Sequence, residues 1–263
     1  MDLYAMDRYI KSLIKEAGHR IRTSFLSDIT IESKSNANDL VTNIDKETEQ
    51  FFIERIRTDF PEHRIFGEEG FGDNIENLQG VVWLLDPIDG TMNFVHQKRN
   101  FAISLGIYED GIGKLGYIYD VVNDDLYHGV KDGGAYYNDE RLKPLMDTVI
   151  AESIVAMNAT WAIPNRYLDH EATIQLIRDV RGMRSYGSAA LELAYLASGR
   201  IHAYISMRLS PWDIAGGMVI AKEVGAITTN FRGAPANLLK QDTFIAANPS
   251  IHHELLDKYI QFK

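Results

Sequence analysis

The sequence predicts a layered α/β fold in which an α+β part precedes an alternating part. Apolar residues recur at helical spacing over residues 2–24 and 43–60, which predicts two amphipathic helices near the N-terminus. Apolar runs separated by glycines or polar turns follow between residues 101 and 142, and they predict consecutive antiparallel strands. Beyond Pro144, strand and helix patterns alternate. We therefore expect a division near residue 145, with parts 1–145 and 146–263 sharing a single cleft.

The composition excludes several classes of partner. With 45% apolar and 24% charged residues, the 263-residue chain is typical of a globular protein. A formal charge of −10 argues against nucleic acid or an anionic membrane as the main partner, although bound cations would let an acidic protein handle an anionic substrate. The chain has no cysteine, which excludes disulfides and thiolate chemistry and fits a reducing compartment. Without an apolar signal core or a run near the roughly 20 residues that span a bilayer, we expect a cytoplasmic protein.

The elements of the first part can be placed in order. The helix over 2–24 is indicated by one apolar stripe: Leu3, Met6, Ile10, Leu13, Ile14, Ala17 and Ile21. The polar segment 27–39 is expected to be extended, and Pro61 ends the second helix. Residues 63–69 predict a short strand that ends in Glu68 and Glu69. Further strands are expected at 81–85, 101–108, 114–122, 125–130 and 135–142.

The second part begins with a predicted strand at 153–157. Helices are expected at 165–180, 188–197, 213–224 and 250–260. Strands are expected between them at 202–207, 226–229 and 243–246. This alternation predicts a sheet with helices packed on its faces.

The stretch 81–96, VVWLLDPIDGTMNFVH, is the centre of the functional prediction. Its apolar run reads as a buried strand, and Asp86 and Asp89 follow where that strand is expected to end. Pro87 stiffens the turn between the two carboxylates, and Gly90 permits a close backbone approach. Fixed acidic oxygens at the end of a strand suit a hard cation such as Mg²⁺. The alternative is a capped turn, with Asp89 as the N-cap of a helix that starts near Thr91.

Acidic residues occupy five predicted junctions between elements: Asp45, Glu68, Asp86, Asp89 and Asp213. Functional side chains of layered α/β folds gather at such junctions. Carboxylates brought together there would repel one another unless cations neutralise them, so their convergence would imply metal binding. Taken alone, any one of them is more often a helix cap than a ligand, and the periodicity does not show whether they converge.

Four strings carry a resemblance that spans nearly the whole chain. LVTNID (40–45), GEE (67–69), WLLDPIDGTMNFVH (83–96) and WDIAGGMVIAKEVGA (212–226) resemble the inositol monophosphatase family in order and spacing. That family belongs to the lithium-sensitive, Mg²⁺-dependent sugar phosphatases. The resemblance implies a layered α/β/α/β/α sandwich, of the type shared with fructose bisphosphatase.

The resemblance also implies roles for individual residues. Glu68, Asp86 and the backbone carbonyl of Ile88 match the ligands of a first Mg²⁺ ion. A second ion would be held by Asp86, Asp89 and Asp213, and Glu68 with waters would hold a weaker third. Asp45 and Thr91 match the pair that orients and deprotonates the attacking water. The N–H groups of Gly90 and Thr91 would hold the phosphate oxygens.

The substrate side is expected at the start of the helix over 188–197. There Gly187, Ser188 and Ala189 resemble the family's sugar-contacting segment, and Asp213 would also contact the substrate; a plain helix cap at Ser188 is the alternative. Where inositol-specific animal members carry a glutamate seven residues before the last metal aspartate, this chain has Ser206. Two further interpretations are open: Arg184 and Arg208 would meet a second phosphate or a nucleotide or else lie solvated, and Lys34 would approach the third metal or else lie in a solvated loop.

The predicted function is hydrolysis of a phosphate monoester by metal-activated water, with two to three Mg²⁺ ions as cofactors. Inositol 1-phosphate or a related small ester is the expected substrate. The same chemistry on NADP⁺ (at its 2′-phosphate), fructose 1,6-bisphosphate or 3′-phosphoadenosine 5′-phosphate is the alternative. A non-catalytic scaffold is the rival of another class. The resemblance also leads us to expect a homodimer.

Overall fold

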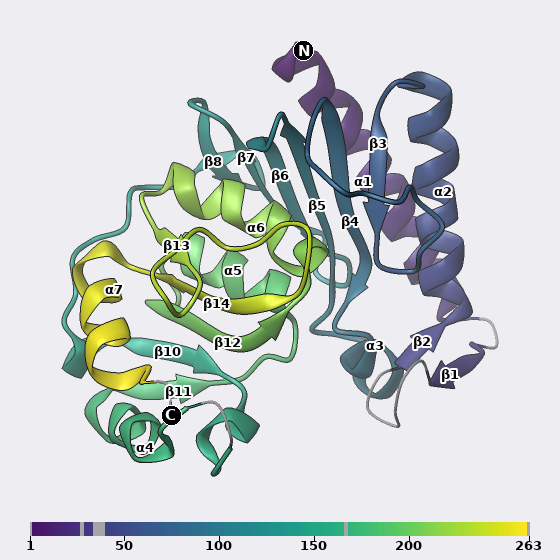
Figure 1. Cartoon of the computed structure of the whole chain (residues 1–263). Coiled ribbons are helices and arrows are strands. Elements are labelled where there is room, and N and C mark those ends of the chain that lie inside the picture. The colour runs from purple at the N-terminus through teal and green to yellow at the C-terminus, as the bar shows by residue number, and fades with distance from the viewer. Residues whose placement is uncertain (1, 27–28, 34–39, 166–167, 262–263) are drawn as a thin grey trace.

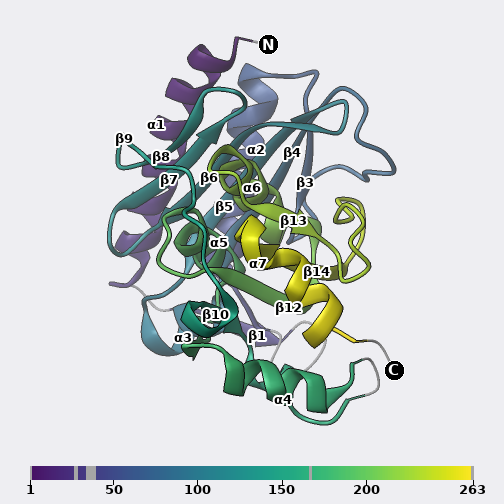
Figure 2. The same cartoon turned by 90° about the vertical axis from the view of Figure 1, so that its left-hand side faces the viewer.

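A computed structural model describes residues 2–26, 29–33, 40–165 and 168–261, and it has five layers (Figure 1). Helices α1 (Leu3–Ser24) and α2 (Asn43–Asp59) cover the outer face of a seven-stranded sheet. Helices α5 (Ala189–Ala197) and α6 (Pro211–Glu223) form the middle layer, and a five-stranded sheet follows. On the far face of that sheet lie α4 (His170–Asp179) and α7 (Pro249–Glu254) (Figure 2). The α/β/α/β/α sandwich is thus confirmed.

The two N-terminal helices form because their apolar stripes face the same sheet. Ile10, Ile14 and Ile21 of α1 are fully buried against Phe52 and Ile56 of α2 and the strands beneath them. The carboxylate of Asp2 caps α1 by accepting the N–H groups of Tyr4 and Ala5. Among the described helices, none combines the length and the apolar composition that a bilayer crossing requires.

The seven-stranded sheet follows the sequence order of its strands. They are β3 (Arg64–Gly67), β4 (Val81–Asp89), β5 (Ala102–Glu109), β6 (Ile112–Asp120), β7 (Asp125–Val130), β8 (Gly134–Tyr137) and β9 (Glu140–Arg141). Only the β3–β4 pair is parallel; the remaining pairs are antiparallel, as predicted. The segment expected as one strand at 135–142 is divided into β8 and β9 by the turn at Asn138 and Asp139, both of which have positive φ.

Strand β4 is longer than predicted. It continues to Asp89, whereas we expected it to end at Leu85. Asp86 lies opposite Ser104 and Asp89 lies opposite Ala102, so three steps along β4 match two along β5. This bulge absorbs Pro87, which has no N–H to donate to the ladder. The pairing therefore carries both carboxylates to the edge of the sheet.

The five-stranded sheet has the order β11 (Gly182–Arg184), β10 (Ile154–Met157), β12 (Ala203–Leu209), β14 (Asp242–Ala247) and β13 (Ile227–Thr229). Strand β10 is parallel to both neighbours, and β14 is antiparallel to both of its own. The short edge strand β11 was not predicted. The helix expected at 165–180 begins only at His170, because Asp169 caps it, and the last predicted helix continues beyond α7 as a π-helical turn at Leu255–Tyr259.

Several short elements complete the described chain. Strands β1 (Ile31–Ser33) and β2 (Leu40–Thr42) form a two-stranded sheet, and α3 (Thr91–Gln97) follows β4. Two 3₁₀ helices lie at Ile150–Glu152 and Ala159–Ala162. Much of the segment 27–39, expected to be extended, lies outside the described residues, as does Lys34.

Helix α6 lies directly on the backbone of three strands. Gly106, Gly116 and Gly129 are cross-strand neighbours on β5, β6 and β7. A Cβ at Gly106 would lie 2.7 Å from the carbonyl carbon of Ala215, and one at Gly129 would lie 2.9 Å from Cα of Ile220. This row of glycines lets α6 approach the sheet closely, and so fixes the position of the first turn of the helix.

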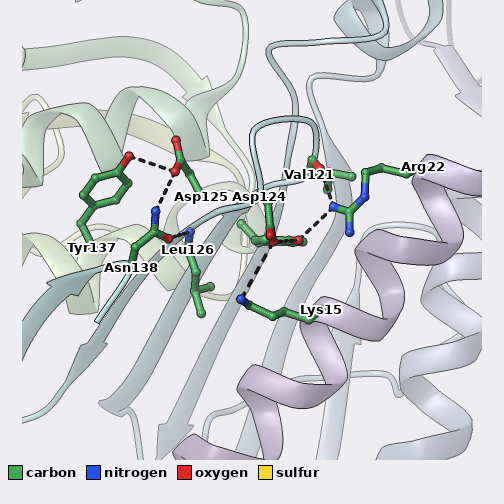
Figure 3. Close-up of polar contacts among 9 residues, drawn as sticks. Lys15, Arg22, Val121, Asp124, Asp125, Leu126, Tyr137 and Asn138 are labelled. Carbon is green, nitrogen blue, oxygen red and sulfur yellow. Dashed lines mark hydrogen bonds and ion pairs between the residues drawn. The ribbon is translucent and has the colours of Figure 1, made fainter. Parts of the chain in front are cut away.

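The C-terminal end of α1 is joined to the turn between β6 and β7 (Figure 3). Nη1 of Arg22 donates to the hydroxyl of Tyr119 at 2.9 Å and to the carbonyl of Val121 at 2.6 Å. On the other side of the turn, Asp125 accepts hydrogen bonds from Tyr137 and Asn138. The contacts of Arg22 hold α1 against the sheet, and those of Asp125 join β7 to β8 and the turn that follows it.

Candidate active site

The ends of two parallel strands bring Glu68 and Asp86 together. Gly67 of β3 lies opposite Leu85 of β4, and the N–H of Glu68 donates to the carbonyl of Leu85 at 3.2 Å. The next residue of each strand therefore emerges at the same edge of the sheet. The side chains of Glu68 and Asp86 are within hydrogen-bonding reach of each other.

Asp86, Asp89 and Asp213 form the centre of the site. One carboxylate oxygen of each lies within 4.8 Å of those of the other two. Oδ1 of Asp86 accepts the N–H of Ile88 at 3.0 Å, which holds the turn of the DPID segment. Asp213 occupies the third position of α6, and its Oδ2 accepts the N–H of Ser210 at 2.7 Å. The close packing of α6 on the sheet thus delivers a carboxylate that lies far away in the sequence.

Asp89 does not cap the helix that follows it, so the alternative interpretation of this turn is wrong. The N-cap of α3 is Gly90, which has a φ of 99°. Oδ2 of Asp89 instead accepts the hydroxyl of Ser188 at 2.5 Å and the N–H of Ala190 at 2.7 Å. Asp89 thereby links the end of β4 to the first turn of α5, while Ser188 is also the N-cap of α5.

Asp45 and Thr91 lie together beside this cluster. Oδ1 of Asp45 is 3.3 Å from the hydroxyl of Thr91, which is also 3.1 Å from the carbonyl oxygen of Ile88. Oδ2 of Asp45 accepts both the N–H and the hydroxyl of Thr42 in a capping box at the start of α2. The capping box orients Asp45, so that its Oδ1 faces the hydroxyl of Thr91.

Burial and mutual repulsion raise the pKa values of these carboxyl groups. Burial, followed by the nearby carboxylates of Glu68, Asp89 and Asp213, raises the pKa of Asp86 well above its usual range. Burial raises the pKa of Asp89 to about 6, although hydrogen bonds from Ser188 and Ala190 oppose the shift. The pKa of Asp45 is also raised to about 6, mainly by burial.

This cluster fits a hard divalent cation. Its donors are carboxylate oxygens, which Mg²⁺ prefers over nitrogen or sulfur. Three buried or half-buried acids within 4.8 Å also repel one another, and a cation relieves that repulsion. The donor set and the repulsion both favour a metal centre here.

The start of α3 faces the same region. Within the described residues, no side chain caps the N-terminus of α3. A Cβ at position 90 would lie 3.1 Å from the carbonyl oxygen of Gly187 and 3.2 Å from that of Asn100. Nδ2 of Asn93 donates to the carbonyls of Asn100 and Tyr186. The predicted phosphate segment and the predicted sugar segment therefore lie side by side.

A pocket of about 240 Å³ opens next to Asp89. It is lined by Gly187, Ser188 and Ala189, the residues that the resemblance assigns to the substrate side. Ser206 and Arg208 of β12 also line it. Arg184 is not among the described residues that line this pocket; it is exposed, and its guanidinium donates to the carbonyl of Met183.

Two buried glutamates that were not predicted from the sequence also support the site. Glu49 accepts the N–H groups of Glu69 and Phe71 at 2.7 and 2.9 Å, and so holds the loop that carries Glu68. Glu49 lies one helical turn after Asp45 on the same face of α2, and this spacing was a detectable signal.

The second is Glu192, whose Oε1 accepts the N–H of Tyr186 at 2.8 Å. This bond holds the segment before Gly187, and burial raises the pKa of Glu192 to about 7. The sequence offered only a charged residue within the mainly apolar helix α5 as a signal.

Comparisons with known proteins agree with this geometry. The model of the inositol monophosphatase family matches residues 2–263. The inositol-1-monophosphatase of Bacillus subtilis (strain 168) is 58% identical over 255 residues, covering 97% of this chain and 96% of the relative. A fructose-1,6-bisphosphatase/inositol-1-monophosphatase of Thermotoga maritima is 33% identical and covers 95% of both chains.

Solved structures of relatives have the same fold. Inositol monophosphatase II of Staphylococcus aureus MSSA476 superimposes with a TM-score of 0.88 at 42% identity, over 97% of this chain and 96% of the other. An IMPase/NADP phosphatase complexed with Mg²⁺ and phosphate gives a TM-score of 0.91 at 28% identity, over 100% and 99% of the two chains. The chain therefore belongs to the inositol monophosphatase family.

Proposed function

We propose that this protein is a Mg²⁺-dependent phosphomonoesterase that hydrolyses inositol 1-phosphate or a related small phosphate ester. The observation that carries the proposal is the carboxylate cluster of Asp86, Asp89 and Asp213, whose oxygens lie within 4.8 Å of one another. The Asp45–Thr91 pair stands beside it. Membership of the family and the name of the Bacillus subtilis relative, inositol-1-monophosphatase, support the same reaction.

The proposed metal ligands divide into overlapping sets. Glu68, Asp86 and the carbonyl of Ile88 would hold one ion, and Asp86, Asp89 and Asp213 a second, with Glu68 contributing to a third. When bound, Mg²⁺ neutralises phosphoryl charge and lowers the pKa of water. The raised pKa of Asp86 marks a group whose ionised form needs a cation.

The remaining groups would orient the reactants. Asp45, held by Thr42, would accept the proton of the attacking water at Oδ1, and the Thr91 hydroxyl between Asp45 and Ile88 would orient that water. The N–H groups of Gly90 and Thr91 at the uncapped start of α3 would donate to the phosphate oxygens.

The leaving group would occupy the pocket next to Asp89. Gly187, Ser188 and Ala189 line it, and they would contact the sugar hydroxyls together with Asp213. Fructose 1,6-bisphosphate, NADP⁺ and 3′-phosphoadenosine 5′-phosphate are the alternative substrates. The Thermotoga maritima relative is named for the first of these, and one solved relative is named an NADP phosphatase.

The test is phosphate release from four esters with and without Mg²⁺: inositol 1-phosphate, fructose 1,6-bisphosphate, NADP⁺ and 3′-phosphoadenosine 5′-phosphate. We expect release that requires Mg²⁺ and that Li⁺ at tens of millimolar, an order-of-magnitude threshold, inhibits by replacing a catalytic ion. The ranking of the esters identifies the substrate class. Release from none of them, with Mg²⁺ shown to bind, would favour the non-catalytic scaffold.

We further propose that the protein is a cytoplasmic homodimer. The absence of cysteine fits a reducing compartment, and family membership supports the dimer. We also propose that residues 1–145 and 146–263 act as two parts with a shared cleft. The contribution of Asp213 to a cluster otherwise built from residues before 145 supports this division.

A further inference from the structure

A bulge in β12 turns one arginine out of an otherwise buried strand. Ser206 lies opposite Phe244 and Leu209 lies opposite Asp242, so three steps along β12 match two along β14. Arg208 lies inside this bulge and is the one exposed residue of the strand. Bulges next to active sites commonly redirect a side chain. Here the redirected residue is Arg208, which lines the pocket next to Asp89.

The hydroxyl of Ser206 forms hydrogen bonds with the backbone of the bulge. Its Oγ donates to the carbonyl of Arg208 at 3.3 Å and accepts the N–H of Arg208 at 3.4 Å. Both hydrogen-bonding functions of the Ser206 hydroxyl are therefore used within β12. The strand presents a guanidinium to the pocket rather than an acceptor for sugar hydroxyls.

The charges in the pocket make this guanidinium distinctive. Of the described residues that line the pocket, Arg208 is the only cation, whereas Asp89 and Glu192 are acidic. Its guanidinium forms no ion pair with any carboxylate of the described chain. Trp161 and Asn158 lie on the wall of the same pocket. An anionic group entering the pocket would therefore meet an un-neutralised, planar donor.

We propose that Arg208 determines substrate specificity by binding a second phosphate of the ester, the one that is not hydrolysed. The inference rests on the proposed function, because it places the scissile phosphate at the carboxylate cluster. A guanidinium binds phosphate through paired charge-assisted hydrogen bonds, whereas a neutral polyol offers it no charge. Esters that carry a second phosphate, such as sugar or nucleotide bisphosphates, would therefore gain binding in this pocket that a polyol monophosphate such as inositol 1-phosphate does not.

The test compares two esters that share the 1-phosphate and of which only one carries a second phosphate: fructose 1-phosphate and fructose 1,6-bisphosphate. In the Arg208→Gln variant we expect KM for the bisphosphate to rise about tenfold relative to KM for the monophosphate, with kcat within about twofold. Arg208→Lys keeps the charge but loses the paired geometry, so it should recover part of the effect. Arg184→Gln removes a nearby exposed arginine outside the pocket and should leave the ratio unchanged.

Two results would overturn the proposal: equal changes of both KM values in Arg208→Gln, or the same shift in Arg184→Gln, which would indicate long-range charge alone. If the wild type releases phosphate from neither of these esters nor from inositol 1-phosphate, the proposed function fails separately. Calorimetric binding of the two esters in Mg²⁺ then decides the role of Arg208. A wild-type preference for the bisphosphate that Arg208→Gln abolishes supports it, and equal affinities refute it.

Discussion

Asp89 combines two tasks in one carboxylate. One is membership of the carboxylate cluster, and the other is acceptance of hydrogen bonds from Ser188 and Ala190 at the start of α5. An asparagine at this position keeps the shape and one acceptor oxygen but removes the charge. The two tasks can therefore be separated by one substitution.

We expect Asp89→Asn to lower kcat by roughly 100-fold or more while the fold is kept. Without metal, the variant should melt at or above the wild-type temperature, because a source of repulsion with Asp86 and Asp213 is removed. The increase in Tm on adding Mg²⁺ should shrink. Thermal melts in EDTA and in Mg²⁺, with exposed Asp132→Asn as the control, check both effects. Near-normal turnover at saturating Mg²⁺ would refute the assignment of Asp89.

Among single residues, the acidic side chains of the site could be predicted from the sequence better than the groups that form hydrogen bonds with them. Asp45, Asp86 and Asp213 could be predicted because each lies at or near the end of an element and matches a family string. The true partners of Asp89 lie 99 and 101 residues away, so only the resemblance suggested that Ser188 is near. Glu49 was missed because its acceptor role depends on a loop 20 residues further along the chain.

At the scale of elements, periodicity located most helices and strands, but not their irregularities. The bulge at Asp86–Asp89 depends on the pairing of β4 with β5, which no local pattern shows. The row formed by Gly106, Gly116 and Gly129 is likewise meaningful only once the strand register is known. These two features position the cluster, and both arise from pairing between strands rather than from propensity within one.

The link between α1 and the β6–β7 turn should contribute measurably to stability (Figure 3). Arg22 makes two partly buried hydrogen bonds, to Tyr119 and Val121. We expect Arg22→Gln to lower the free energy of unfolding by about 1–3 kcal/mol, because a charged donor is lost and its acceptors remain. Urea denaturation at constant m value measures the change.

Lys15→Gln is the matched control for this prediction. Lys15 lies on the same helix and approaches Asp124 of the same turn at 4.0 Å, but both side chains are more than half exposed. Its removal should change stability by less than about 1 kcal/mol. Equal losses in the two variants would show that the burial of the Arg22 contacts is not what stabilises the turn.

At the scale of the whole molecule, the middle layer explains why the site lies where it does. Helices α5 and α6 pack against both sheets, and their first turns supply Ala190 and Asp213 to the carboxylate cluster of β4. The layer order was predictable from the sequence and the resemblance. How the two helices sit on the sheet was not, since it depends on tertiary packing of residues far apart in the chain.

Buried histidines link the stability of the whole fold to pH. Burial lowers the pKa values of His63, His128, His202 and His252, and that of His128 falls to about 4. Each of these groups therefore takes up its proton at a lower pH in the folded protein than an unfolded histidine, which does so near pH 6.5. The histidines therefore lower the free energy of unfolding as the pH falls from about 6.5 toward 4. The raised pKa values of Asp45, Asp89 and Glu192 act in the opposite direction, because these groups bind protons more readily in the folded protein.

His128 allows this coupling to be tested at one residue. Its ring stacks on Tyr136 at 5.0 Å and lies parallel to Tyr117, and its Nδ1 has no hydrogen-bond partner among the described residues. His128→Phe should therefore keep the packing and remove the titration. We expect the free energy of unfolding of His128→Phe to match that of the wild type at pH 7 and to exceed it by about 2 kcal/mol at pH 5, since 1.5 pH units below 6.5 correspond to about that free energy.

Urea unfolding of the wild type and His128→Phe at both pH values measures this difference. The control is the exposed His253→Gln, which should leave the pH dependence of the wild type intact. Parallel stability curves for the wild type and His128→Phe would show that other groups cause the acid sensitivity.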